Sequence, residues 1–311
     1  MRRLSFALTL SLGSLMLAGC EFDPTDWGNS DRYREEFASQ HKLAPGGRVM
    51  LESFNGSVEI VGWEKDAVDI SGVKYASREE VMHDIKIDVV PEAESIRIRA
   101  IRPIDHNCNC GAKFVLKVPK RANLDNITTS NASIRIDSVN GNARLKTSNG
   151  SVNVWNVEGE LEATTSNASI EIGKFKGPAE LRTSNGRIKA EGMEGAFNAK
   201  TSNSSIDATI SSLQADRRTV LESSNGSINL TLDKWNKNEV RATTSNSSIN
   251  VRIPEDIHAD LRATTSNGHI TSDLAVTSNQ FSKTRLAGQI GGGGPLLELV
   301  TTNGNIRLMK R

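Results

Sequence analysis

A short motif that recurs at nearly constant spacing constrains the fold of this chain more than any other feature. The motif is Thr-Ser-Asn-(Gly/Ala/Ser)-x-(Ile/Val), and successive copies are separated by four gaps of 18 residues, then by gaps of 22, 21, 21 and 36. Repeats of this length indicate a solenoid, because a single turn of this size cannot bury its own apolar face. The repeated asparagines are Asn131, Asn149, Asn167, Asn185, Asn203, Asn225, Asn246, Asn267 and Asn303, with an early copy at Asn55.

Apolar residues lie at fixed offsets from these asparagines. A β-branched aliphatic residue follows each Asn by three positions, and a second, mostly apolar position follows two residues later, usually after a polar one. This alternation is typical of a strand with one buried face. A further apolar column lies four residues before each Asn, and the regular coils have another at Val139, Val157, Phe175 and Met193. The sequence therefore predicts coils with two short strands and a third, less regular side.

The asparagines are expected at the bends of the coils. Asn tolerates the left-handed backbone region better than other non-glycine residues. Its side-chain amide can also bond to the Asn one coil away, which predicts a ladder of stacked amides. We therefore predict an all-β fold, a single-stranded β-solenoid with about 18–22 residues per coil. The apolar offsets do not fit the six-residue period of left-handed β-helices, which favours a right-handed coil.

The motif predicts one long domain over residues 45–311. Residues 126–311 contain the regular Asn-ladder coils, whereas 45–125 are expected to form irregular coils, because 64–125 lack the motif but still alternate at 85–89, 96–98 and 114–118. Residues 20–44 are largely polar and are interpreted as a tether and cap.

The first nineteen residues are predicted to be a signal peptide. A basic start precedes a short apolar run, which ends in Leu17-Ala18-Gly19-Cys20. This ending resembles the bacterial lipoprotein box, which implies cleavage before Cys20 and a diacylglycerol on its thiol. Glu21 in place of Asp resembles lipoproteins sorted to the outer membrane. The expected partner at this end is therefore a membrane, and the expected location is an exported, lipid-anchored state, with the chain anchored rather than spanning.

Charge argues against nucleic acid as a partner. Removing the signal removes Arg2 and Arg3, so 38 − 2 = 36 basic residues face 37 acidic ones. A nearly neutral chain lacks the basic field that binding to a phosphate backbone requires.

Cys108 and Cys110 are a candidate disulfide. Exported thiols favour oxidation, although residues two apart approach the upper limit of bridging distance. Metal binding by His106, Cys108 and Cys110 is the alternative, but it lacks a visible fourth ligand. No other metal site, cofactor or catalytic residue is predicted. The outward column four residues after Asn mixes both charges, which is typical of a solvated strand face.

The chain resembles the bacterial putative-adhesin family, a β-helical domain of unknown function. The resemblance covers roughly residues 45–309 and rests on four segments: Pro45 to Val49 leading to Asn55-Gly56-Ser57-Val58 and Trp63; Val118-Pro119; Leu286 to Gly293; and Thr302 to Ile306. It implies a non-catalytic, adhesin-like scaffold that contacts an envelope polymer or protein. Two alternatives stay open: a polysaccharide-acting enzyme of β-helix type, and an envelope-signalling lipoprotein.

Overall fold

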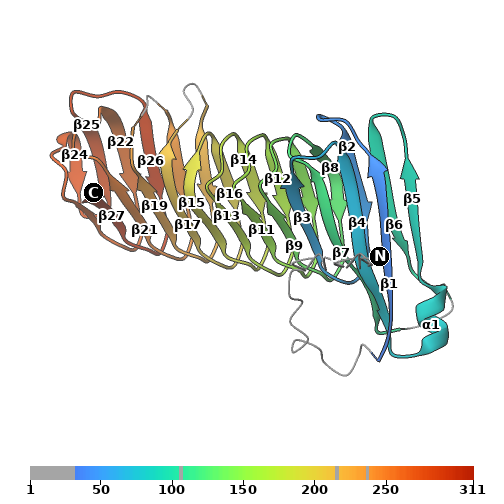
Figure 1. Cartoon of the computed structure of the whole chain (residues 1–311). Coiled ribbons are helices and arrows are strands. Elements are labelled where there is room, and N and C mark those ends of the chain that lie inside the picture. The colour runs from blue at the N-terminus through green and yellow to red at the C-terminus, as the bar shows by residue number, and fades with distance from the viewer. Residues whose placement is uncertain (1–31, 105–107, 214–216, 236–237) are drawn as a thin grey trace, which may run out of the picture.

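The chain winds into a rod of stacked coils, whose strands form two long sheets (Figure 1). The structure is a computed structural model and describes residues 32–104, 108–213, 217–235 and 238–311. The predicted signal peptide, Cys20 and His106 lie outside the described residues. Val152 pairs directly with Ile170 in parallel register, as the predicted stacking requires. The all-β solenoid is therefore confirmed, and its winding sense stays a prediction.

Each coil contributes one strand to each sheet, and neighbouring coils pair in parallel over most of the rod. The first sheet contains, in spatial order, β1 (Tyr33–Lys42), β4 (Ala67–Ala76), β7 (Cys110–Pro119), β3 (Val58–Trp63), β9 (Ile134–Asp137), β11 (Val152–Trp155), β13 (Ile170–Gly173), β15 (Ile188–Glu194), β17 (Ile206–Ser212), β19 (Ile228–Leu232), β21 (Ile249–Ile253), β27 (Ile306–Lys310) and β23 (Ile270–Ser272).

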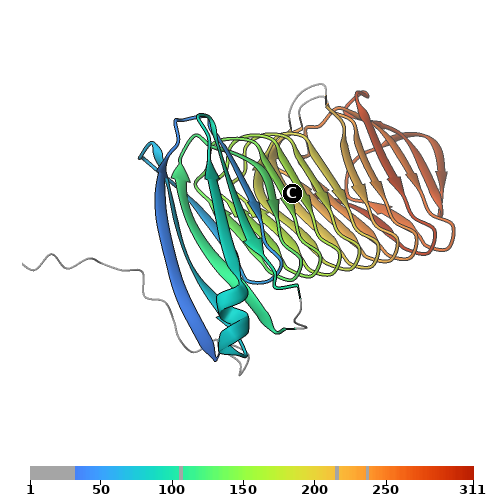
Figure 2. The same ribbon diagram turned by 90° about the vertical axis from the view of Figure 1, so that its right-hand side faces the viewer.

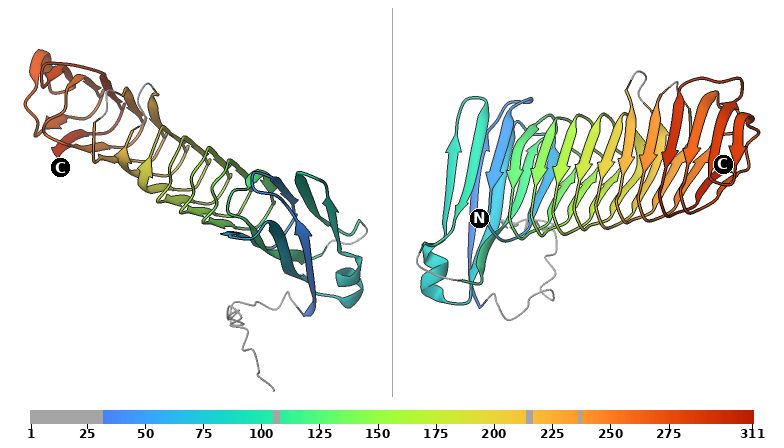
Figure 3. Two further views of the ribbon diagram at one scale, coloured as in Figure 1. Left: turned by 45° about the horizontal axis from the view of Figure 1, so that its top comes forward. Right: turned by 180° about the vertical axis from the view of Figure 1, so that it is seen from behind.

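The second sheet lies across the core from the first and runs along the same rod (Figure 3). Its strands, from the C-terminal end of the rod, are β24 (Thr277–Ser282), β25 (Arg285–Ile290), β22 (Ala259–Thr264), β26 (Leu296–Val300), β20 (Val240–Thr243), β18 (Thr219–Glu222), β16 (Phe197–Lys200), β14 (Ala179–Arg182), β12 (Leu161–Thr164), β10 (Ala143–Lys146), β8 (Asn123–Thr128), β2 (Arg48–Glu52), β6 (Ser95–Ile101) and β5 (Lys86–Pro91).

The predicted apolar columns form a single core along the rod. Every residue three positions after a repeated Asn is buried, as is every residue four positions before one, and Val139, Val157, Phe175 and Met193 fill the third side. Burial of each large aliphatic side chain stabilises the fold by about 1.5–3 kcal/mol. Because each coil packs only on its neighbours, this stabilisation accumulates along the stack.

The third side contains the left-handed bend, which the sequence analysis placed at the repeated asparagines. Among the described residues, the non-glycine residues with positive φ are Ser138, Asn156 and Lys174, and Gly192 occupies the same position one coil later. These residues lie seven positions after the ladder Asn, next to single bridges that link Asn140, Glu158, Lys176 and Glu194. The expectation of left-handed ladder asparagines was therefore wrong.

At both ends of the rod the order of coils in space differs from their order in the chain. The β2–β3 coil lies between β6–β7 and β8–β9, so the first coil of the chain lies one coil inside the stack. The last coil, β26–β27, likewise lies between β20–β21 and β22–β23. The gap of 36 residues before Asn303 is the consequence, because the chain passes through an outer coil and then returns.

Antiparallel strands close both ends (Figure 2). At the N-terminal end β1, β4 and β7 pair antiparallel, β5 pairs antiparallel with β6, and the short helix α1 (Glu79–Asp84) covers a small second core. At the C-terminal end β24 and β25 form an antiparallel pair against β22. The alternating segments predicted between residues 64 and 125 correspond to β5, β6 and β7, whereas α1 was not predicted.

Candidate functional site

The repeated asparagines form one continuous ladder along an exposed edge of the rod. Each Nδ2 donates to the Oδ1 of the Asn in the adjoining coil, at distances from 2.6 to 2.8 Å. Both irregular ends take part, since Asn131 donates to Asn55, and Asn303 lies between Asn246 and Asn267. Asn55 in turn donates to the carbonyl of Cys110 at 2.9 Å, which ties the ladder to the N-terminal cap.

A buried hydroxyl column supports the ladder. From Asn149 onward, the Thr or Ser two residues before a ladder Asn donates to the carbonyl one residue after the Asn of the adjoining coil, as Thr165 does to Gly150 and Thr201 to Gly186. The sequence analysis identified the motif but missed this role of its Thr. The available signal was the residue type at this position of the motif, because only Thr or Ser occupies it in the copies from Thr129 onward.

Glycine alternates with Ala or Ser immediately after the ladder Asn. The order from coil to coil is Ala132, Gly150, Ala168, Gly186 and Ser204, and a Cβ on Gly150 or Gly186 would overlap the carbonyl of the preceding coil. In the glycine coils the backbone N–H also donates to the buried hydroxyl, as Gly186 does to Thr183 at 3.1 Å. Along this edge the structural repeat is therefore two coils.

The outward faces of the sheets are held together by ion pairs between coils. Arg144 contacts Glu162 at 3.0 Å, Lys200 contacts Glu222 at 3.1 Å, and Arg218 contacts Glu239 at 2.6 Å. Exposed pairs of this kind stabilise a protein by at most about 1 kcal/mol each. Their main effect here is to neutralise the outward face of the second sheet.

Asp207, on the first sheet, accepts three side-chain hydrogen bonds. Partial burial on its own would raise the pKa of this carboxyl group, but hydrogen bonds from Asn229, Arg187 and Ser205 hold the pKa below its ordinary value. Asn250 donates to Asn229 at 2.8 Å and extends this second amide row. Asp207 is therefore ionised and acts as a structural acceptor.

The two cysteines lie at the N-terminal cap. Cys108 and Cys110 are joined as a disulfide with their Cα atoms 5.2 Å apart, and Cys110 is fully buried in the small second core. The alternative metal site needs His106, which lies outside the described residues. Among the residues that the structure describes, no group of three or more His, Cys, Asp or Glu side chains could hold a metal ion.

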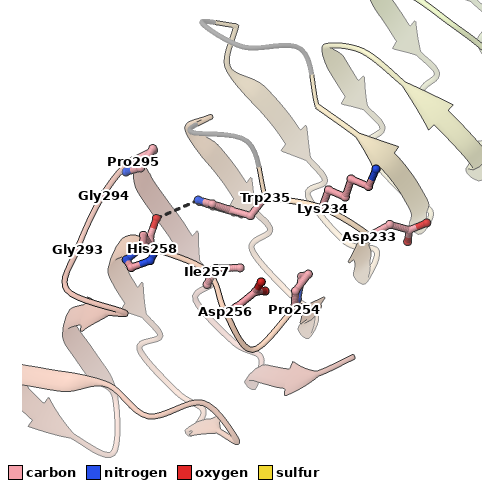
Figure 4. A pocket seen from close by; sticks show the side chains of 10 residues that line it. All are labelled: Asp233, Lys234, Trp235, Pro254, Asp256, Ile257, His258, Gly293, Gly294 and Pro295. Atoms are coloured by element: carbon pink, nitrogen blue, oxygen red, sulfur yellow. Dashed lines mark hydrogen bonds between the residues drawn. The ribbon is translucent and has the colours of Figure 1, made fainter.

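A candidate binding site is a pocket of about 670 Å³ on the third side, near the C-terminal end of the rod. It is lined by residues from three loops: Asp233–Trp235 after β19, Pro254 and Asp256–His258 after β21, and Gly293–Pro295 after β25 (Figure 4). These loops belong to the coils longer than 18 residues, so their extra residues build the walls. The sequence analysis missed the pocket, although the change of spacing from 18 to 21 and 22 residues marked the place.

Among the described residues no helix is long and apolar enough to cross a bilayer.

Comparisons with known proteins agree with the fold. Residues 111–309 match the family model described as Toastrack DUF4097. A search of the curated proteins gives no significant match.

A search of the solved structures finds matches that cover most of the chain at low sequence identity and low TM-score. A putative cell adhesion protein from Clostridium sporogenes is 12% identical, with coverage of 90% of this chain and 100% of that chain and a TM-score of 0.22. A putative lipid binding protein from Parabacteroides distasonis is 10% identical, with coverage of 90% of this chain and 98% of that chain and a TM-score of 0.39. A putative adhesin from the same organism is 11% identical, with coverage of 88% of this chain and 97% of that chain and a TM-score of 0.33.

Proposed function

Because the chain belongs to the Toastrack family, we propose that it acts as a non-catalytic, adhesin-like scaffold of the bacterial envelope, held at a membrane through lipid on Cys20. The supporting observation is the continuous Asn ladder, which runs above an unbroken core from one antiparallel cap to the other. Such a rod is stiff, because every coil is fixed to two neighbours by backbone, amide and hydroxyl hydrogen bonds. Its long polar faces suit contact with an extended envelope polymer or with another protein.

Lipid attachment is tested on the whole chain in a bacterial host. Metabolic labelling with a radioactive fatty acid is expected to label the wild type, which should sediment with membranes, and a change of Cys20→Ser is expected to abolish both. Cys108→Ser together with Cys110→Ser is the matched control, because these cysteines lie in the N-terminal cap and their loss should leave labelling unchanged. Label on the Cys20→Ser variant would contradict the proposal.

Adhesin-like binding is tested by incubating the lipidated protein with purified envelope polymers and with envelope extract. Saturable capture of one polymer or protein supports the scaffold function, and the captured material identifies the partner. A membrane protein captured by cross-linking would favour the signalling alternative. Capture no stronger than that of the urea-unfolded chain would contradict the scaffold function.

A polysaccharide-acting enzyme is the second candidate, because Asp233 and Asp256 line one pocket with Lys234 and His258. Paired carboxyl groups are the usual catalysts of glycoside hydrolysis. Against this, Asp233 is held by Arg311 at 2.6 Å, which leaves it poorly placed to transfer a proton. Release of new reducing ends from polysaccharides, lost in Asp256→Asn, would establish the enzyme and overturn the scaffold.

A further inference from the structure

The pocket on the third side has the composition of a sugar-binding site. We propose that it binds a neutral sugar unit of an envelope glycan, an inference that rests on the proposed contact with envelope polymers and names the place where that contact occurs. The pocket lies where three long loops converge. The first two loops follow β19 and β21, which pair in parallel as the strands of the shorter coils do, and the third follows β25, which pairs antiparallel with β22.

Trp235 supplies an aromatic surface that the fold holds in place. Its indole Nε1 donates to the carbonyl oxygen of His258 at 3.0 Å, across two of the three loops (Figure 4). The ring is half-buried and packs against the main core, yet it also lines the pocket. A sugar ring has a face of C–H groups that can pack on such an aromatic ring, while its hydroxyl groups point outward to polar partners.

Polar groups line the pocket on the loop that carries this ring and on the next loop. The carboxylates of Asp233 and Asp256 accept hydrogen bonds from hydroxyl groups, and Lys234 and His258 can donate them. This combination of one aromatic platform and a few converging polar groups is typical of small-ligand sites.

Glycine brings the third loop close to the others. Gly291, Gly292 and Gly293 all have positive φ, and a Cβ on Gly294 would overlap the backbone of His258. A side chain at Gly291 or Gly294 would overlap the carbonyl of Ile257 or of His258 and would therefore separate these two loops. The run of glycines after β25 is explained by this close approach and by the positive φ angles.

The charges favour a neutral ligand. The two carboxylates of the pocket are balanced by Lys234 within it and by Arg311, which contacts Asp233. A phosphate or a strongly basic peptide would meet no net opposite charge there. The volume of about 670 Å³ lies within the range of small-ligand sites, about 300–1,000 Å³, and suits one or two sugar rings of a longer chain.

The inference is tested with the lipidated protein in detergent and neutral hexasaccharides of β-1,4-glucose, α-1,4-glucose and β-1,4-N-acetylglucosamine, measured by titration calorimetry. The wild type is expected to bind at least one of them, and Trp235→Ala to weaken that binding by about tenfold or more. Trp235→Phe keeps an aromatic ring and should retain most of the affinity. If the Ala variant does not fold, as judged by circular dichroism, the loss in Asp256→Asn decides instead.

Trp155→Ala is the matched control. Trp155 lies over Gly173 on the first sheet, away from the pocket, so its removal should leave the affinity within about twofold of the wild type. Absence of binding to all three sugars, or equal binding by Trp235→Ala, Asp256→Asn and the wild type, would overturn the inference. Capture of envelope material by wild type and Trp235→Ala alike would do so too, while leaving the scaffold function intact.

Discussion

The 18-residue coils and the longer coils share two sheets and one core, but they differ on the third side. From Asn131 to Asn203 the third side is a compact bend with a left-handed residue and a bridge to the next coil. Between Asn203 and Asn267 each coil has three or four more residues than the 18-residue coils. Loops replace the compact bend there, and a pocket forms between loops of the longer coils. Regular spacing therefore maintains the rod, and departures from it create a place for a ligand.

The largest expected effect tests whether the two kinds of coil share one core. Ile170→Ala in a short coil and Ile249→Ala in a long coil should each lower the free energy of unfolding by about 2–5 kcal/mol, because both side chains are fully buried. Urea unfolding followed by circular dichroism measures this. Glu171→Ala, on the outward face, should stay within about 0.5 kcal/mol of the wild type. A small effect at Ile249 alone would show that the long coils pack loosely.

The second prediction compares the ladder edge with the third side. Gly186→Ala should cost about 1–3 kcal/mol, because the new Cβ would overlap the carbonyl of Ala168. Gly192→Asn should cost little, since its position is open and the same place in earlier coils holds Ser138, Asn156 and Lys174. Thermal unfolding of the two variants separates the cases. Equal losses would mean that the third side is as tightly packed as the ladder edge.

The third prediction tests the buried hydroxyl column inside the regular coils. Thr165→Val should destabilise the rod by about 1–2 kcal/mol, because the carbonyl of Gly150 would lose its donor. Thr129 is the internal control, because its hydroxyl is buried without a hydrogen-bond partner among the described residues. Thr129→Val should therefore be neutral or stabilising by up to about 1 kcal/mol. A loss at Thr129 equal to that at Thr165 would refute the assigned role.

The smallest expected effect lies where the short coils meet the long ones. The folded state lowers the pKa of Asp207, so the unfolded state binds the proton more readily, and the stabilisation is present above the unfolded pKa of about 4. It is lost as the pH falls through the lower folded pKa. Unfolding midpoints of Asp207→Asn and wild type, measured from pH 7 to pH 2.5, should therefore converge toward acid pH. A constant difference would contradict the pKa shift.

The sequence predicted the features that depend on neighbouring coils. Val152, Ile170 and Ile188 stack because each lies at the same offset from its Asn, and a fixed period in a solenoid translates directly into contact. The amide ladder followed from the same rule. The left-handed bend did not, because Ser138, Asn156, Lys174 and Gly192 share a conformation without sharing a residue type.

The remaining features depend on segments far apart in the chain. Nothing local to Asn303 indicates that its coil inserts before that of Asn267, because strand pairing decides the order. The pocket joins Trp235, His258 and Gly293, which no single period relates. Long-range pairing and loop convergence are therefore the parts of this fold that the repeat alone could not predict.

The inserted end coils have a consequence for how such rods can change in length. Each end is closed by antiparallel strands that lie outside an inserted coil, so neither closure depends on how many turns separate the two. Duplication or deletion of an 18-residue unit between Asn131 and Asn203 would shift one terminus relative to the other and leave both closures intact. Descendants of one gene could thus differ in the length of the rod through recombination within the central repeats alone.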